Sequence, residues 1–412
     1  MEARRRRLLR LLLLGFSATW LAFVPSWFRI LDGTWPAWAL GAHALLLTLA
    51  AFVLERRNKA SAAAVAGLCV FAVAIPTLFL MSLRAASEPY QYVHDSAVQS
   101  EEAMRFLLAG KNPYATSYET TVMAQVPFWG GKNPALEHYV YFPYSFLVPA
   151  PLFAASTALW GWYDHRLFLL LMFGAMLWGG WRSAAPEWRA HLLIAVGLNP
   201  AFDLYTIQGS NDAAVVGLLL PAIGLAGRNP LAAAGFVGLA CGFKQTAVYF
   251  AFLFLADVFG RHGARRCVLA ALVTGLVGAA AVLPFAAWDA RAFYDSTYGY
   301  LAGSAKVSYP AVGLSIPAAV ERLGLAATAP AWLTTALQLG VVLPVLLWLA
   351  WSQVRSPGAS GLAFRYGVAI LLAFVCARYC HTAHVAYASL FFVASWFLPG
   401  ARSAEERAHM VE

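Results

Sequence analysis

The feature that most constrains this chain is a succession of thirteen apolar stretches. A membrane-spanning helix needs roughly 20 apolar residues. Only 12% of the 412 residues are charged, against roughly 25% in soluble proteins. The pattern therefore predicts an all-α, polytopic integral membrane protein. The stretches are 8–30, 36–54, 60–83, 142–162, 165–181, 190–206, 212–226, 230–244, 246–259, 267–287, 330–351, 362–377 and 382–398.

The basic residues fall mainly in short loops between these stretches, which is the pattern of cytoplasmic loops in membrane proteins. This distribution predicts that both termini are inside and that two long segments, 84–141 and 288–329, are outside. It also accounts for the formal net charge of +9 without a nucleic-acid partner. We expect a single membrane domain over 1–412.

One apolar stretch is expected not to cross. The first outer segment must be outside and Arg228 inside, yet four apolar stretches lie between them. Either 142–162 is an incomplete crossing, or 190–206 is re-entrant and broken at Asn199-Pro200. Both alternatives leave about 12 transmembrane helices.

The first outer segment carries a candidate catalytic group. Its stretch 96–109 suits an amphipathic helix lying in the membrane interface, and Asp95 stands at the N-terminus of that helix, after His94. Asp95 either caps the helix or is a carboxylate kept ionised by the helix dipole and His94, ready to deprotonate a hydroxyl. Glu101 and Glu102 are either further site carboxylates or, as we prefer, the solvated face of the helix.

Polar residues interrupt the apolar pattern again further along the chain. Tyr141 and Tyr144 lie at the mouth of a membrane segment, where aromatic belts are ordinary. Asn211 and Asp212 either cap the next helix or line a site. Lys244, between two short apolar segments, either snorkels to the surface or, as we prefer, is a fixed positive charge for a group such as phosphate.

The last break contains Arg378, His381 and His384. These residues suit a site for a phosphate or sugar hydroxyls, and the alternative is an interfacial Arg with two surface histidines. Cys376 and Cys380 lie beside them, but the spacing of these side chains does not complete a tetrahedral metal site. We therefore expect no metal.

In their order along the chain, these features resemble the GT-C superfamily of membrane glycosyltransferases. The closest likeness is to the bacterial polyprenol-phosphate-mannose-dependent mannosyltransferase-like group. In that family the large outer loop often follows the first helix, whereas here it follows the third, so residues 1–59 are interpreted as an accessory helix pair. The motifs that carry the likeness are His94-Asp95 with Glu102 and Leu107–Tyr114, Tyr141-Phe-Pro-Tyr144, Gln208-Gly-Ser-Asn-Asp212 and Gly238–Gln245.

The resemblance implies transfer of a mannose-like hexose from a polyprenyl-phosphate donor to a lipid or glycan acceptor of the cell envelope. It places the reaction on the extracytoplasmic face of the bacterial plasma membrane. Asp95 would be the catalytic base, and no cofactor is implied. The residues expected to bind substrate are His94, Glu102, Asn112, Tyr114, Tyr141, Tyr144, Gln208, Asn211, Asp212, Lys244, Gln245, Arg378, His381 and His384.

Two other functions are considered. A transporter or flippase of a lipid-linked or polar solute would place its polar site near the membrane midplane, often between repeated halves. Here the ionisable residues gather toward one outer face, which favours an enzyme. A non-catalytic membrane partner with a degenerate site is the third interpretation, and the intact Asp95, Asp212 and Lys244 argue against it.

Overall fold

The computed structural model describes residues 2–31, 33–128 and 133–400, and helices make up most of this part of the chain. The first half contains α1 (Glu2–Ala22), α2 (Val24–Ile30), α3 (Trp35–Arg56), α4 (Ala62–Ala85), α5 (Asp95–Leu108), α6 (Tyr144–Leu147), α7 (Ala150–Trp160), α8 (Arg166–Ser183), α9 (Arg189–Gly197) and α10 (Pro200–Gln208).

The second half contains α11 (Asp212–Ala226), α12 (Pro230–Phe243), α13 (Thr246–Trp288), α14 (Ala290–Tyr294), α15 (Tyr300–Ala302), α16 (Ile316–Arg322), α17 (Ala331–Leu337), α18 (Leu343–Arg355), α19 (Ala359–Val375) and α20 (Thr382–Ser395). Short 3-10 or π turns are η1 (Val122–Gln125), η2 (Pro134–Leu136), η3 (Pro186–Trp188), η4 (Asp295–Gly299) and η5 (Gln338–Val342). The two-residue strands β1 (Val312–Gly313) and β2 (Tyr379–Cys380) pair in parallel.

Ordinary local chemistry explains several helix boundaries. Ser61 and Asn229 each accept a hydrogen bond from the backbone amide three residues later, which caps α4 and α12. Gly161 and Gly209 end α7 and α10 with φ of 74° and 105°, a left-handed conformation that favours glycine. A non-helical Gly263 divides α13 into two helices, matching the two separate stretches expected there.

Five helical segments of the described chain are long and apolar enough to cross a membrane, or six if α9 and the preceding η3 are joined with α10 across a 56° bend. Five further apolar helices are shorter. These findings agree with the predicted all-α membrane protein, while the number of about 12 crossings stays a prediction.

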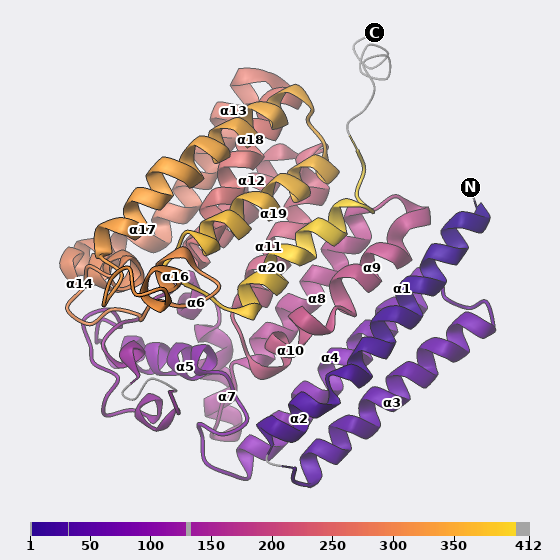
Figure 1. Ribbon diagram of the computed structural model, residues 1–412, viewed down its shortest axis with the longest axis horizontal. Coiled ribbons are helices and arrows are strands. Elements are labelled where there is room, and N and C mark those ends of the chain that lie inside the picture. Colours follow the sequence, from indigo (N-terminus) through magenta and orange to yellow (C-terminus); the bar gives the residue numbers. More distant parts are fainter. Residues whose placement is uncertain (1, 32, 129–132, 401–412) are drawn as a thin grey trace.

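The stretch 142–162 forms α6 and α7, and α7 has only 11 residues. At 1.5 Å per residue α7 extends about 16 Å, roughly half of the hydrocarbon thickness of a bilayer. It lies at the same end of the bundle as α5 (Figure 1). The stretch 190–206 is also interrupted, by the 56° bend between Gly197 and Pro200, so both alternatives for the incomplete crossing stay predictions.

Within the described part of the chain, the helices enclose a small cluster of three alanines and two large buried cores. The larger one runs through the long helices and is lined by small and aliphatic side chains. The smaller one is mostly aromatic and packs the first outer segment against the end of α13, with Tyr114, Tyr139, Phe146, Phe285 and Phe293 among its members. This second core holds the outer segment as an ordered cap on the bundle.

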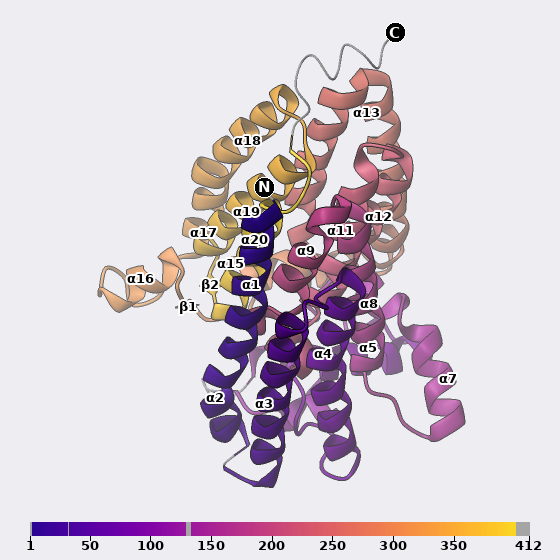
Figure 2. The same ribbon diagram turned by 90° about the vertical axis from the view of Figure 1, so that its right-hand side faces the viewer.

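The polar loops gather at one end of the molecule. Figure 1 shows α5, α6, α14 and α16 toward that end, whereas the turn within α13 lies at the opposite end. Figure 2 shows α7 and α16 projecting from different sides of the same region. The β1–β2 pair joins the second outer segment to the chain after α19. Helices α1 and α3 pack together at the edge of the bundle (Figure 1).

Helix α5 corrects one prediction. Glu101 and Glu102 were expected on a solvated face, but they are only 3% and 6% exposed. The reason is that Arg84, at the end of α4, binds Glu101 with both terminal guanidinium nitrogens. The helix is therefore buried inside the protein over most of its length, and does not lie free in the interface.

Candidate active site

A cavity of about 550 Å³ opens where the start of α5 meets the starts of α11 and α20 and the junction of α12 with α13. Its wall brings together side chains that are far apart in the sequence. The predicted site residues that line it are His94, Asp95, Tyr141, Gln208, Asp212, Lys244, Gln245, His381 and His384.

Asp95 is the first residue of α5 and forms an ion pair with His94. The Asp95 Oδ1 atom lies 2.7 Å from His94 Nδ1, and the side chains are 40% and 35% exposed. Burial would raise the pKa of the Asp95 carboxyl, but the charge and hydrogen bond of His94 lower this pKa below its ordinary value. Burial likewise opposes protonation of His94, yet Asp95 raises the pKa of the imidazole overall. The pair therefore favours an ionised Asp95.

The loop that carries Asp95 is tied to the turn before α11. The His94 amide donates to the Gln208 carbonyl at 2.7 Å, and the Ser96 hydroxyl donates to the Gly209 carbonyl at 3.1 Å. These bonds set the start of α5 beside the start of α11. Asp95 is therefore positioned by the backbone of both segments.

Asp212 and Lys244 form a second ion pair in the cavity wall. Lys244 Nζ lies 2.6 Å from Asp212 Oδ1, with side chains 14% and 9% exposed. Ser210 donates to the other carboxylate oxygen at 3.2 Å, and Lys244 Nζ lies 5.6 Å from the centroid of the Tyr141 ring. The partner of Lys244 comes from a distant part of the sequence, because the fold brings the start of α11 against the α12–α13 junction.

His381 and His384 line the cavity from the start of α20. His384 Nδ1 accepts a hydrogen bond from the His381 amide at 2.9 Å, and His381 Nε2 lies 3.2 Å from the Tyr309 hydroxyl. Burial lowers the pKa of His381, and Asp95 opposes this only in part. His381 is therefore a neutral hydrogen-bonding group at neutral pH.

Several residues that were expected to bind substrate do not line this cavity. Asn112 Oδ1 accepts from the Tyr114 amide at 3.0 Å, and the Tyr114 hydroxyl donates to the Tyr141 carbonyl. The Tyr144 hydroxyl donates to a carbonyl in α13 at 2.9 Å. Glu102 faces a different pocket. The structure gives these side chains packing and backbone contacts within the outer cap.

Arg378 and Asn211 also lie apart from the cavity lining. Arg378 donates to the carbonyls of Tyr309 and Ala329, because the β1–β2 pair turns it toward the second outer segment. Arg378 is thus engaged with backbone carbonyls outside the cavity lining, and its expected part in binding substrate stays a prediction. Asn211 points to Ser100 on α5, to which its amide donates at 3.1 Å.

Several residues around the site were not among those expected from the sequence. Tyr300, Tyr309 and Tyr379 line the cavity, and the aromatic richness of the outer loops was their only signal. Asp164 and Arg166, both fully buried, were also missed. An ionisable pair at the start of an apolar stretch was the signal that would have found them.

The arrangement offers two kinds of chemistry. The Asp95 carboxylate can accept a proton from a hydroxyl, and Lys244 with protonated His94 can stabilise negative charge in a partly enclosed space. Among the residues that the structure describes, no three His, Cys, Asp or Glu side chains are grouped to hold a metal ion.

Comparison with known proteins adds one finding. The family model described as glycosyltransferase family 87 matches residues 139–377, more than half of the chain. The matched region contains Asp212 and Lys244 and ends before His381, whereas Asp95 precedes it. No curated protein matches the sequence.

Proposed function

Because the chain belongs to glycosyltransferase family 87, we propose that it transfers a mannose-like hexose from a polyprenyl-phosphate donor to a lipid or glycan acceptor of the cell envelope. The reaction would take place on the extracytoplasmic side of the bacterial plasma membrane. The observation that carries the proposal is that Asp95 and the Asp212–Lys244 pair face one cavity at the end of the bundle that bears the long polar loops.

Asp95 would serve as the general base. Its carboxylate takes the proton from the acceptor hydroxyl while the hydroxyl oxygen forms a bond to the anomeric carbon of the donor. The bond between that carbon and the phosphate oxygen breaks, and polyprenyl phosphate leaves with the electron pair. Lys244 would bind the phosphate by sharing its charge between the phosphate and Asp212.

An apolar groove supports a lipid-linked donor. The groove, of about 460 Å³, runs between α13 and the η5–α18 segment and includes Phe252, Leu255 and Leu346. One end is marked by a hydrogen bond of 2.9 Å from the Tyr249 hydroxyl to Gln338. Tyr249 follows the cavity residue Gln245 by one helical turn. A polyprenyl chain in this groove would bring its phosphate toward Lys244.

The test is hexose transfer by the purified protein in lipid nanodiscs, supplied with polyprenyl-phosphate hexoses. We expect Asp95→Asn to lower turnover by about 10²- to 10⁴-fold, because it removes the proton acceptor. Glu88→Gln changes an exposed carboxyl of the same outer segment and is expected to leave turnover unchanged.

Unchanged turnover in Asp95→Asn would overturn the assignment of the base. Movement of the donor across liposome membranes without any sugar transfer would instead support a transporter or flippase.

A further inference from the structure

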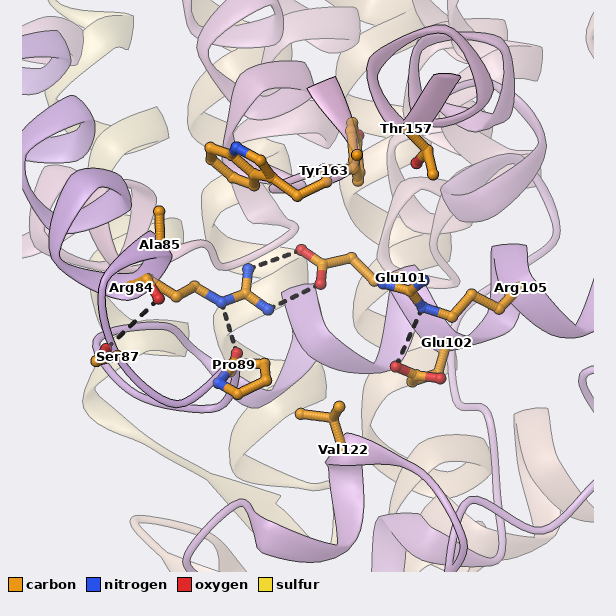
Figure 3. Close-up of a pocket in the computed structure, with 12 residues that line it drawn as sticks. Arg84, Ala85, Ser87, Pro89, Glu101, Glu102, Arg105, Val122, Thr157 and Tyr163 are labelled. Carbon is orange, nitrogen blue, oxygen red and sulfur yellow. Dashed lines mark hydrogen bonds and ion pairs between the residues drawn. The ribbon is translucent and has the colours of Figure 1, made fainter. Parts of the chain in front are cut away.

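A group of four charged side chains is buried beside the active-site cavity. Arg84, Glu101, Asp164 and Arg166 are 7%, 3%, 0% and 0% exposed. Arg84 donates to both carboxylate oxygens of Glu101 at 2.9 and 2.8 Å, and its Nε donates to the Pro89 carbonyl (Figure 3). Of the four, Arg84 and Glu101 line a second cavity of about 330 Å³.

Asp164 joins the two arginines. It accepts from Arg84 Nη1 at 3.0 Å and from Arg166 Nε and Nη2 at 2.9 and 2.7 Å. Two positive and two negative charges therefore balance. A buried ion pair often contributes no more stability than apolar residues of the same shape, so stability alone is a weak reason for such a group. The hydrogen bonds from these residues and from the adjacent His165 to the segments around the cavity indicate the role of the group.

Arg166 reaches the loop that carries Asp95. Its Nη1 donates to the Tyr92 carbonyl at 2.8 Å, and Tyr92 has a φ of 57°, uncommon for a residue with a side chain. The stem of Arg166 also packs on Gly209, where an added Cβ would lie 3.2 Å from Arg166 Cγ. Arg166 thus contacts both segments that carry the carboxylates of the site.

His165 reaches the start of α11. Its amide donates to Glu101 at 2.9 Å, and its Nε2 lies 3.1 Å from Asn211 Oδ1. Because Asn211 Oδ1 can only accept a hydrogen bond, the His165 ring donates from Nε2. Asn211, directly before Asp212, in turn donates to Ser100 on α5.

We propose that Asp164-His165-Arg166 is a positioning unit that holds the Asp95 loop and the start of α11 in one fixed arrangement. None of the three side chains lines the active-site cavity, so each acts through another residue. The catalytic part of this inference rests on the proposed glycosyl transfer.

The test is His165→Leu. Leucine is similar in size to histidine but cannot form the hydrogen bond to Asn211. We expect turnover to fall roughly 10- to 100-fold with the donor KM within about twofold, because small misplacement of reacting groups lowers the rate rather than binding. His165→Gln restores a donor and is expected to recover part of the turnover. Hydrogen–deuterium exchange is expected to rise in 92–96 and 208–212.

The matched control is His191→Leu. His191 is also buried, and its Nε2 makes a 3.0 Å contact with the Arg5 carbonyl, away from the cavity. We expect it to leave turnover and exchange of the site segments unchanged, with thermal unfolding in detergent showing that both variants fold.

Equal turnover losses in the two Leu variants, or unchanged exchange of 92–96 and 208–212 in His165→Leu, would overturn the positioning role. If the native protein transfers no hexose while exchange still rises in those segments, the proposed function fails and the positioning unit stands.

Discussion

Among the single residues of the candidate site, the contact between Asp95 and His94 is expected to set how the proposed activity responds to pH. Protonated His94 lowers the pKa of Asp95, and Asp95 raises the pKa of His94. Across the range between the two pKa values the carboxyl is ionised and the imidazole is charged. A base with this neighbour loses activity on the acid side only when the carboxyl itself takes up a proton.

His94→Gln is therefore expected to move the acid limb of the pH–rate profile to higher pH. Removing the positive charge takes away the effect that lowers the Asp95 pKa, while burial, which raises it, remains. The measurement is kcat/KM from about pH 4 to about pH 8. His262→Gln, at the distant turn within α13, should keep the native profile. An acid limb that stays in place in both variants would show that His94 does not set the protonation of Asp95.

Some residues of the candidate site can be predicted from the sequence, but their long-range ion pairs cannot. Asp212 and Lys244 interrupt apolar patterns, and an ionisable group near lipid is costly unless it faces a cavity; this local argument identified residues that do line one. Asp95 was identified differently, by its place at the N-terminus of a predicted helix in the outer segment, and it lines the same cavity. The ion pairs between residues far apart in the chain could not be predicted in this way. Lys244 with Asp212, and Arg84 with Glu101, are contacts made by the packing of separate helices, and no local pattern contains them.

At the scale of elements, the turn between α10 and α11 has a demanding geometry. Gly209 has a φ of 105°, and an added Cβ would lie 3.1 Å from Ala97 Cβ and 3.2 Å from Arg166 Cγ. Gly161, at the end of α7, has a φ of 74° but no atom within 4 Å of an added Cβ. Substitutions at the two glycines therefore distinguish the cost of a left-handed backbone, which both share, from the cost of close packing, which only Gly209 has.

Gly161→Ala is expected to cost only the left-handed conformation, about 1 to 2 kcal/mol. Gly209→Ala should cost more, because the methyl group also presses on Ala97 and Arg166, and it should lower turnover roughly tenfold by shifting the start of α11. Thermal unfolding in detergent and hexose transfer measure the two effects. Equal unfolding temperatures for the two variants would contradict the packing argument.

The long helices could be predicted from the sequence, because the apolar pattern of a helix depends only on neighbouring residues. The stretches 36–54 and 60–83 correspond to α3 and α4. The burial of α5 could not be predicted from the sequence, because its Glu101 is paired with Arg84 from another helix. The same limit applies to Arg378, which the β1–β2 pair turns toward backbone carbonyls.

For the chain as a whole, the topology predicts on which side of the membrane each loop lies. The aromatic core of the outer cap, the candidate active-site cavity and the proposed positioning unit all lie around α5. If 142–162 does not cross, α8 enters the membrane from that side and the η3 turn after it lies on the other. If 142–162 crosses, η3 and the cavity share a side.

Single cysteines at three exposed positions, Lys111, Glu187 and Asn58, distinguish these topologies. In right-side-out vesicles we expect a membrane-impermeant thiol reagent to label Lys111→Cys at once. Glu187→Cys and Asn58→Cys should react only after permeabilisation, because both follow a crossing toward the basic, cytoplasmic side. The unsubstituted chain, whose free cysteines are buried or half-buried, measures the background. Labelling of Glu187→Cys from outside would show that 142–162 spans the membrane, and protection of Lys111→Cys would place the active-site cavity on the cytoplasmic face.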